Sequence, residues 1–257
     1  MAQSRAVVTG APITRPRRKP WLSIKPAAWR GAASILSVVI LWEVAARTIV
    51  NNPLFFAPLS AVGSRTIELW RANELQIHIW TSLQEFLLGF VFASAVGILS
   101  GVLMAASDTM RDFFDPWVSM LYSTPIIALG PLFILWFGIG MSSKIAVIFL
   151  VVVFPVLINT FAGLTTTDRN LIEAARSFGA STAQIFAKVR FPAAMPFIIT
   201  GLRLGVARGL VGVVVAELFG AKAGLGFLIL ISAQTFDTAG LFVGVLILAF
   251  SGVVAVE

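Results

Sequence analysis

Long apolar runs separated by short polar segments dominate the sequence. Six of these runs are long enough to cross a bilayer, which takes about 20 helical residues. They cover about residues 31–50, 81–106, 117–138, 145–164, 196–220 and 239–256. A further apolar run at 224–231 is too short to span and favours a re-entrant segment, whereas the mixed charges of 51–80 are typical of an outer amphipathic helix. The pattern predicts an all-α membrane protein with about six transmembrane helices.

Prolines and glycines within these runs bear on how the spans bend and pack. The third predicted span contains Pro125 and Pro131, and proline inside a span indicates a kinked or broken helix. Such a helix can line a pathway or simply bend in order to pack, and both interpretations stay open for Pro125. Glycines four residues apart allow close helix approach in two of the spans: Gly97, Gly101, Gly201, Gly205 and Gly209.

A polar, basic segment interrupts the apolar pattern between the fourth and fifth predicted spans. Asp168 is the expected N-cap of a first short helix, and Gly179 can adopt the left-handed conformation that closes it. Ser181 and Gln184 have the spacing of a capping box that begins a second helix, and Pro192 is expected to end that helix. Two short helices joined at a glycine predict a compact cytoplasmic element, not a span.

The same segment resembles the membrane-spanning permease subunits of bacterial ABC importers. Their hallmark is Glu-Ala-Ala, three residues, Gly, nine residues and Ile-x-Leu-Pro, and this chain has the same spacing with Val and Phe in the last part. The residues that carry the match are Glu173, Ala174, Ala175, Gly179 with Ala180 beside it, Val189, Phe191 and Pro192. The resemblance implies that a loop at about 165–192 docks into a cleft on an ATPase subunit and couples it to the spans.

Composition agrees with the bilayer as the main solvent of this chain. Charged residues are 12% of the 257 residues, against about 25% in soluble domains. There is no Cys and a single His, so thiolate sites and histidine metal clusters are excluded and no metal or cofactor is expected. The phosphate-binding loop Gly-x-x-x-x-Gly-Lys-Ser/Thr is absent, so the chain is expected to be a non-enzymatic subunit that leaves ATP hydrolysis to its partners.

Basic residues are concentrated at the N-terminus. Seven of the nineteen precede residue 31 with no acidic residue among them, which is typical of a cytoplasmic anchor and not of a nucleic-acid surface. Residues 1–30 are interpreted as a disordered basic cytoplasmic tail, followed by a transmembrane permease domain at 31–257. Four crossings then return the chain to the cytoplasm at a second basic cluster, which agrees with the positive-inside rule: Arg169, Arg176, Lys188 and Arg190.

The resemblance extends over nearly all of residues 50–250. It is strongest to the subgroup of permeases for nitrate, bicarbonate, taurine, alkanesulfonates and certain aromatic or pyrimidine compounds. The matching stretches are Ala57-Pro58-Leu59-Ser60-Ala61-Val62, Leu135-Trp136-Phe137-Gly138-Ile139-Gly140, Gly201-Leu202-Arg203-Leu204, Ala216-Glu217 and Gly224-Leu225-Gly226. Two departures are Glu85, where relatives often carry a basic residue, and the end of the chain at Glu257, where relatives usually continue in a basic tail.

The fold implied by the resemblance is a type I importer permease in the bacterial inner membrane, with its N-terminus in the cytoplasm. The implied partners are two ABC ATPase subunits, a second permease copy in a homodimer, a periplasmic or lipid-anchored solute-binding protein and membrane lipid, with no nucleic acid. The competing hypothesis is a self-sufficient secondary transporter or channel. Its expected signs, inverted repeats or a ring of charges, are not evident in the sequence.

Three residues are candidates for the translocation pathway: Arg208, Glu217 and Pro125. Arg208 lies twelve residues after Pro196, which places it roughly 18 Å into the fifth predicted span. Because a charge at that depth costs about 3 kcal/mol or more, it should face protein or a water-filled cavity. Contact with an anionic solute and a structural bond at a dimer seam both stay open for it.

Overall fold

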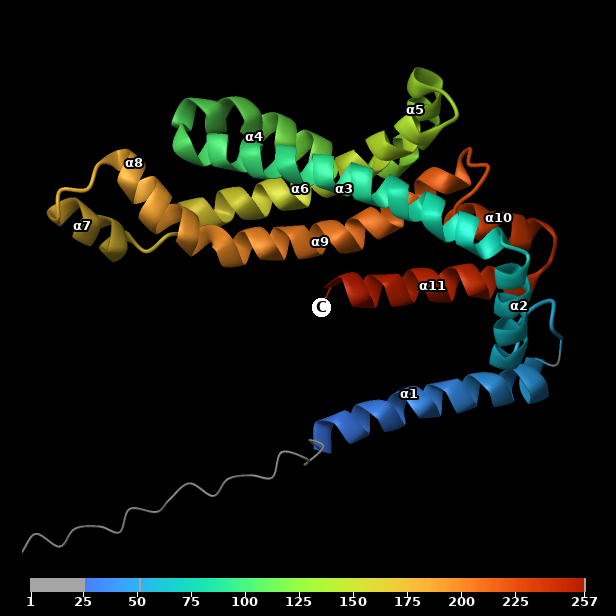
Figure 1. The fold of residues 1–257 in the computed structure, drawn as a ribbon. Coiled ribbons are helices and arrows are strands. Elements are labelled where there is room, and N and C mark those ends of the chain that lie inside the picture. The colour runs from blue at the N-terminus through green and yellow to red at the C-terminus, as the bar shows by residue number, and fades with distance from the viewer. Residues whose placement is uncertain (1–25, 51, 257) are drawn as a thin grey trace, which may run out of the picture. The chain divides into compact units, whose positions relative to one another are not determined.

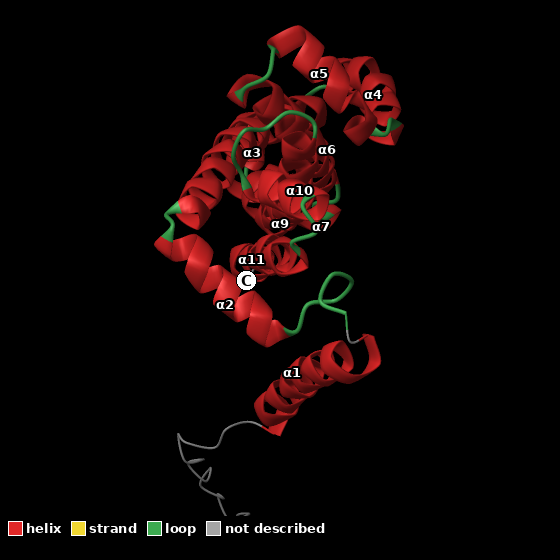
Figure 2. Cartoon of the chain, turned by 90° about the vertical axis from the view of Figure 1, so that its right-hand side faces the viewer, coloured by secondary structure: helices red, strands yellow, loops and turns green. Residues whose placement is uncertain are grey.

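The computed structural model describes residues 26–50 and 52–256, and the chain divides into two compact units, 1–42 and 43–257. The described part of the first unit belongs to α1 (Pro26–Ala45), which continues into the wider turns of η1 (Ala46–Val50). Of the predicted tail 1–30, residues up to 25 lie outside the described part and residues 26–30 are helical. Helices and loops account for all the described residues, without a strand (Figure 2).

The second unit contains the remaining helices, which Figure 1 shows in order along the colour bar. Their bounds are α2 (Leu59–Arg71), α3 (Glu74–Ala106), α4 (Asp108–Ser123), η2 (Ile126–Leu129), α5 (Gly130–Phe137), α6 (Met141–Thr165), α7 (Arg169–Ser177), α8 (Thr182–Ile185), η3 (Phe186–Arg190), α9 (Phe191–Leu218), α10 (Leu225–Gln234) and α11 (Thr238–Val256). Five helical stretches of the described chain are long and apolar enough to cross a membrane, and the bent pair formed by α4 with η2–α5 makes six. The all-α, six-span prediction is confirmed.

The helices α3, α6 and α9 run side by side and form the core of this unit (Figure 1). Their shared interior is apolar and fully buried, with Ala93 on α3, Ile148, Val152 and Val156 on α6, and Val213 on α9. Small residues let the three backbones come close, as the glycine spacing predicted.

The glycines of α3 show how close this approach is. A Cβ on Gly97 would lie 2.8 Å from the carbonyl oxygen of Val153, and a Cβ on Gly101 would lie 2.8 Å from that of Leu157. No larger residue fits at either place without moving α6 away. On α9, Gly201, Gly205 and Gly209 likewise face α6.

The third span is broken, which confirms the prediction from its prolines. Thr124 has the extended backbone expected before a proline, and the helix axis turns by 82° between α4 and η2–α5. The polar residues 108–115, between the second and third predicted spans, form the first turns of α4. The hydroxyl of Ser107 accepts a hydrogen bond from the backbone N–H of Met110, which begins the helix immediately after α3.

The predicted outer amphipathic helix is α2, whose apolar side chains Val62 and Leu69 pack with α10 and α11. Its polar side is anchored by Arg65, which donates hydrogen bonds to Asp237 at 2.8 Å and to Glu68 at 3.0 Å. The bond to Glu68, together with that to Asp237, raises the pKa of Arg65 above its usual value. The short apolar stretch predicted as re-entrant is the ten-residue helix α10 (Leu225–Gln234).

Candidate functional site

The segment predicted to dock on an ATPase, residues 165–192, is called the coupling loop below. Its first helix, α7, is capped at both ends by neighbouring residues of the loop. Asp168 accepts a hydrogen bond from the backbone N–H of Asn170 at 2.9 Å, which confirms it as the N-cap of α7. Gly179 has a φ of +77°, the left-handed conformation predicted for it. Hydrogen bonds from Gly179 to Arg176 and from Ala180 to Ala175 then complete a Schellman turn.

The second helix of the loop starts with the predicted capping box. The hydroxyl of Ser181 accepts a hydrogen bond from the Gln184 N–H at 3.3 Å, and the Gln184 side chain accepts one from the Ser181 N–H at 2.8 Å. Because both bonds use residues three apart, the local sequence determines this turn.

Pro192 does not end the second helix, contrary to prediction. Helix continues without interruption from Thr182 to Leu218, over 37 residues. Pro192 stands directly after a change of helix type, in the first residues of α9, and cannot donate a backbone hydrogen bond there. The preceding π-type turn η3 absorbs the change, with the N–H of Phe191 bonded to the carbonyl of Phe186. The coupling loop is thus joined to the fifth span by one continuous helix.

The exposed surface of the coupling loop includes the acidic side chain of Glu173 and the large apolar side chain of Phe178. The carboxylate of Glu173 lies 3.7 Å from the Nε of Arg169, and both side chains are largely in solvent. Phe178, beside the closing glycine, is 92% exposed. Sequence reasoning did not single out Phe178, although its position between Glu173 and Gly179 in the hallmark was a usable signal.

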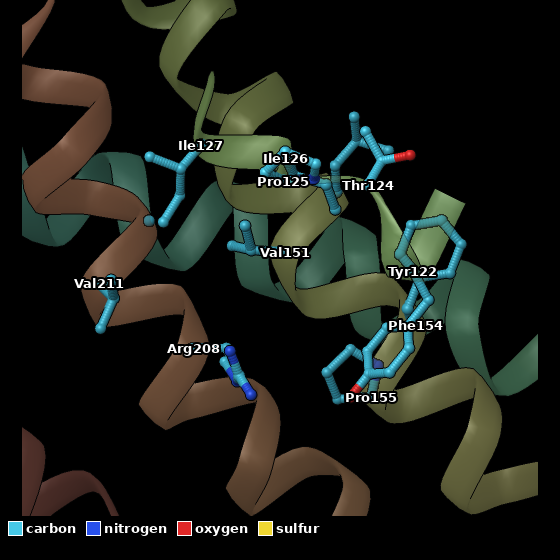
Figure 3. Close-up of a pocket in the computed structure, with 12 residues that line it drawn as sticks. Tyr122, Thr124, Pro125, Ile126, Ile127, Val151, Phe154, Pro155, Arg208 and Val211 are labelled. Carbon is cyan, nitrogen blue, oxygen red and sulfur yellow. The ribbon is translucent and has the colours of Figure 1, made fainter. Parts of the chain in front are cut away.

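A cavity of about 230 Å³ lies where the broken third span faces α6 and α9. Its lining includes two of the predicted pathway residues, Pro125 and Arg208, and otherwise consists mainly of apolar side chains with Tyr122 and Thr124. Figure 3 shows Arg208 extending from α9, with Phe154 and Pro155 of α6 across the cavity from it. Across residues 26–50 and 52–256, Arg208 has neither an ion pair nor a hydrogen-bond acceptor for its side chain. Arg208 is exposed, so the site offers an uncompensated positive charge at the edge of a mainly apolar cavity.

Glu217, the third pathway candidate, is not part of the cavity lining. It is 0% exposed and accepts hydrogen bonds from the Ser82 hydroxyl at 2.5 Å and from the backbone N–H of Gly226. Ser82 in turn accepts one from the N–H of Leu225 at 2.7 Å. A Cβ on Gly224 would lie 2.3 Å from the Glu217 carboxyl, which explains the glycine there. In this arrangement Glu217 joins the first turn of α10 to α9 and α3.

A buried ion pair that the sequence did not predict lies beside this network. The Nζ of Lys144, in the first turn of α6, is 2.5 Å from the carboxylate of Glu85 on α3. The other Glu85 oxygen is buried and has no hydrogen-bond partner in the described residues. The described part of the chain holds no group of three or more His, Asp or Glu residues that could bind a metal ion.

Comparison with known proteins identifies the family. Residues 81–256 match the family described as binding-protein-dependent transport system inner membrane component. The chain belongs to this family. It is therefore a multi-pass membrane permease of an ABC importer, whose partners include an ATPase and a solute-binding protein.

Several relatives of this permease are named as transport permeases for particular solutes. The putative aliphatic sulfonates transport permease protein SsuC of Bacillus subtilis (strain 168) is 36% identical, over 92% of this chain and 85% of its own. The taurine transport system permease protein TauC of Escherichia coli (strain K12) is 33% identical, over 91% of this chain and 87% of its own. The formylaminopyrimidine transport permease protein ThiX of Halalkalibacterium halodurans is also 33% identical, over 85% of this chain and 86% of its own.

A solved structure shares the fold of the permease. It is the MetNI methionine ABC transporter in inward-facing conformations, with a TM-score of 0.60 and 20% identity, covering 72% of this chain and 92% of that chain. The resemblance to importer permeases of the sulfonate and taurine type is thereby confirmed in sequence, and the importer architecture in fold.

Proposed function

We propose that two copies of this permease form the translocation pathway of an importer for a small organic or inorganic anion of the sulfonate, nitrate, bicarbonate or carboxylate type. The N-terminus lies in the cytoplasm, two ATPase subunits bind the coupling loops and hydrolyse ATP, and a solute-binding protein delivers the anion from outside. The names of the sulfonate and taurine relatives support this solute class.

The observation that carries the proposal is the unpaired Arg208, which is exposed and lines a mainly apolar cavity. A guanidinium without a counter-charge gains charge-assisted hydrogen bonds when an anion enters the cavity beside it. Its planar fork of donors suits the oxygens of a sulfonate or carboxylate. Pro125 supports the same site, because the break that it causes in the third span helps to form the cavity wall.

Coupling to ATP hydrolysis is assigned to the exposed end of the loop. Glu173 offers a carboxylate and Phe178 a large apolar side chain, and both are free to enter a cleft of a partner. Buried aromatic anchors commonly contribute much of the binding energy of protein interfaces. The closed turn at Gly179 holds the two helices of the loop at a defined angle, so that force on α7 passes through η3 into α9.

The test uses the complex of permease, ATPase and solute-binding protein reconstituted in vesicles. Arg208→Gln should leave solute-stimulated ATP hydrolysis in place and lower the rate of solute uptake by about 10-fold or more, the effect expected for one lost charge-assisted hydrogen bond. Arg208→Lys keeps the charge and should retain part of the uptake. The matched control is Arg203→Gln, which removes an exposed arginine of the same helix from outside the cavity lining.

Each alternative predicts a different result. Unchanged uptake by Arg208→Gln would dismiss the pathway role, and loss of the assembled dimer would assign Arg208 to the seam between copies. Uptake by the permease alone, without ATPase subunits or ATP, would favour the competing secondary transporter or channel.

A further inference from the structure

A second basic cavity, of about 480 Å³, lies between the end of α3 and the coupling loop. Figure 1 shows α7 and α8 beyond one end of the bundle formed by α3, α6 and α9. The lining consists of Ala106, Arg176, Thr182, Ala183, Ile185, Phe186 and Arg190. It therefore holds two guanidinium groups and one hydroxyl, but no carboxylate.

Neither arginine of this cavity has a counter-charge in the described chain. The acidic side chains of this part of the chain are outside the cavity lining and contact other groups: Glu173 lies beside Arg169, Asp108 and Asp112 beside Arg111, and Asp168 caps the start of α7. The Nε of Arg190 is shielded from solvent and donates to no acceptor among residues 26–50 and 52–256. Because buried donors in proteins almost always have an acceptor, this N–H is suited to bind an oxygen atom of a ligand.

The depth of the cavity indicates where that oxygen comes from. Ala106 is the last residue of the apolar helix α3, and Arg190 is the last basic residue before the apolar sequence of α9 begins. Both ends lie where the apolar spans leave the hydrocarbon region, which is the level of the lipid headgroups. On the proposed orientation this is the cytoplasmic face, where anionic lipids attract arginine and lysine.

We propose that this cavity binds a phosphate group, supplied by the headgroup of an anionic phospholipid. A phosphate oxygen would accept the Nε–H of Arg190, and the other oxygens can accept from Arg176 and from the hydroxyl of Thr182. Free inorganic phosphate offers the same oxygens and is the second source to be distinguished. The ligand would brace the coupling loop against α3, at the joint through which the loop moves the fifth span.

An acidic side chain of the ATPase is the competing occupant, and the geometry disfavours it. The exposed end of the loop, with Phe178 and Glu173, is the part free to enter a partner, whereas the cavity is closed on one side by Ala106 of the membrane helix α3. The inference rests on the proposed orientation of the permease but not on the role of Arg208. Failure of the Arg208 experiment would therefore leave lipid binding unaffected.

The test measures lipid retention by the full-length permease complex, using native mass spectrometry after delipidation. Phosphatidylglycerol and phosphatidylcholine are titrated back separately, with and without inorganic phosphate. The wild-type complex should retain phosphatidylglycerol at least 10-fold more tightly than phosphatidylcholine, and Arg190→Gln should abolish that preference. The control is Lys188→Gln, which removes an exposed positive charge of the same helical stretch from outside the cavity and should leave the preference intact.

A milder variant keeps the test decisive if Arg190→Gln does not assemble. Thr182→Val removes only the hydroxyl and should weaken retention by several-fold in an intact complex. Competition by inorganic phosphate, or binding of phosphate alone, would identify the site as one for free phosphate. Equal retention by the wild type and Arg190→Gln would overturn the proposal. A second result would also overturn it: the wild-type complex shows no preference for either lipid, and the Arg190→Gln complex loses its ATPase subunits. The oxygen that accepts from Arg190 would then belong to the ATPase.

Discussion

Replacing Lys144 by methionine tests how much the buried ion pair with Glu85 stabilises the core. The two charged atoms are 2.5 Å apart, and the side chains are 9% and 1% exposed. Methionine has a similar length and leaves no cavity, so the change mainly removes the charge. The carboxylate of Glu85 is then buried without a cation, and breaking one partner of a buried pair typically costs about 3–5 kcal/mol.

Protonation of Glu85 sets an upper bound on this loss. A buried carboxylate without a cation can bind a proton, and protonating an ordinary carboxylate in water at pH 7 costs about 3.7 kcal/mol. We therefore expect the free energy of unfolding to fall by about 3–4 kcal/mol. At roughly 2–4 °C per kcal/mol for a chain of this size, the melting temperature should fall by about 6–16 °C.

The assay is thermal unfolding of the purified permease in detergent, followed by tryptophan fluorescence. The double variant Glu85→Gln/Lys144→Met removes both charges and should unfold at a higher temperature than the sum of the single effects implies. Lys222→Met is the matched control, because Lys222 is exposed and outside the ion pair, and it should change stability by less than about 0.5 kcal/mol. A single Lys144→Met variant that melts within about 2 °C of the wild type would refute the reasoning.

Three further predictions follow from the packing and the loop. Gly179→Val forces a β-branched residue into a φ of +77°, at a cost of about 1–2 kcal/mol. The permease should stay folded but co-purify with less ATPase, and undiminished association would contradict this. Gly101→Leu should lower the melting temperature, because the new side chain would overlap the Leu157 carbonyl and overpacking costs about 1–3 kcal/mol. An unchanged melting curve would show that α6 can move away at little cost in free energy. The chain has no native cysteine, so single cysteines can report its orientation in the membrane. Thr166→Cys should react with an impermeant thiol reagent only from the cytoplasm and Lys222→Cys only from outside. The reverse pattern would show that the proposed orientation is wrong.

Local sequence was sufficient for the coupling loop. Asp168, Gly179 and the pair Ser181 and Gln184 act on neighbours within a few residues, so their hydrogen bonds follow from spacing alone. The number of spans follows equally directly, because a bilayer requires long apolar helices wherever it is crossed. The family, too, could be recognised from the spacing of Glu173, Gly179 and Pro192.

Local sequence misled where two local signals competed. A proline usually ends a helix, but the π-type turn before Pro192 lets the helix continue past it, and the sequence does not mark where such a turn forms. The residues after Ser107 are polar and typical of a loop, but the cap formed by Ser107 begins a helix among them.

Only the tertiary structure decided the partners of the buried charges. Lys144 meets Glu85 across 59 residues of sequence, and Glu217 meets Ser82 across 135. Such contacts depend on the relative rotation and depth of α3, α6 and α9, which the close packing of glycines against neighbouring helices determines. The sequence showed that Glu85, Arg208 and Glu217 lie in apolar spans, where a charge needs protein partners or a water-filled cavity. Which of them became buried structural bonds, and that Arg208 was left facing a cavity, follows from how the helices pack.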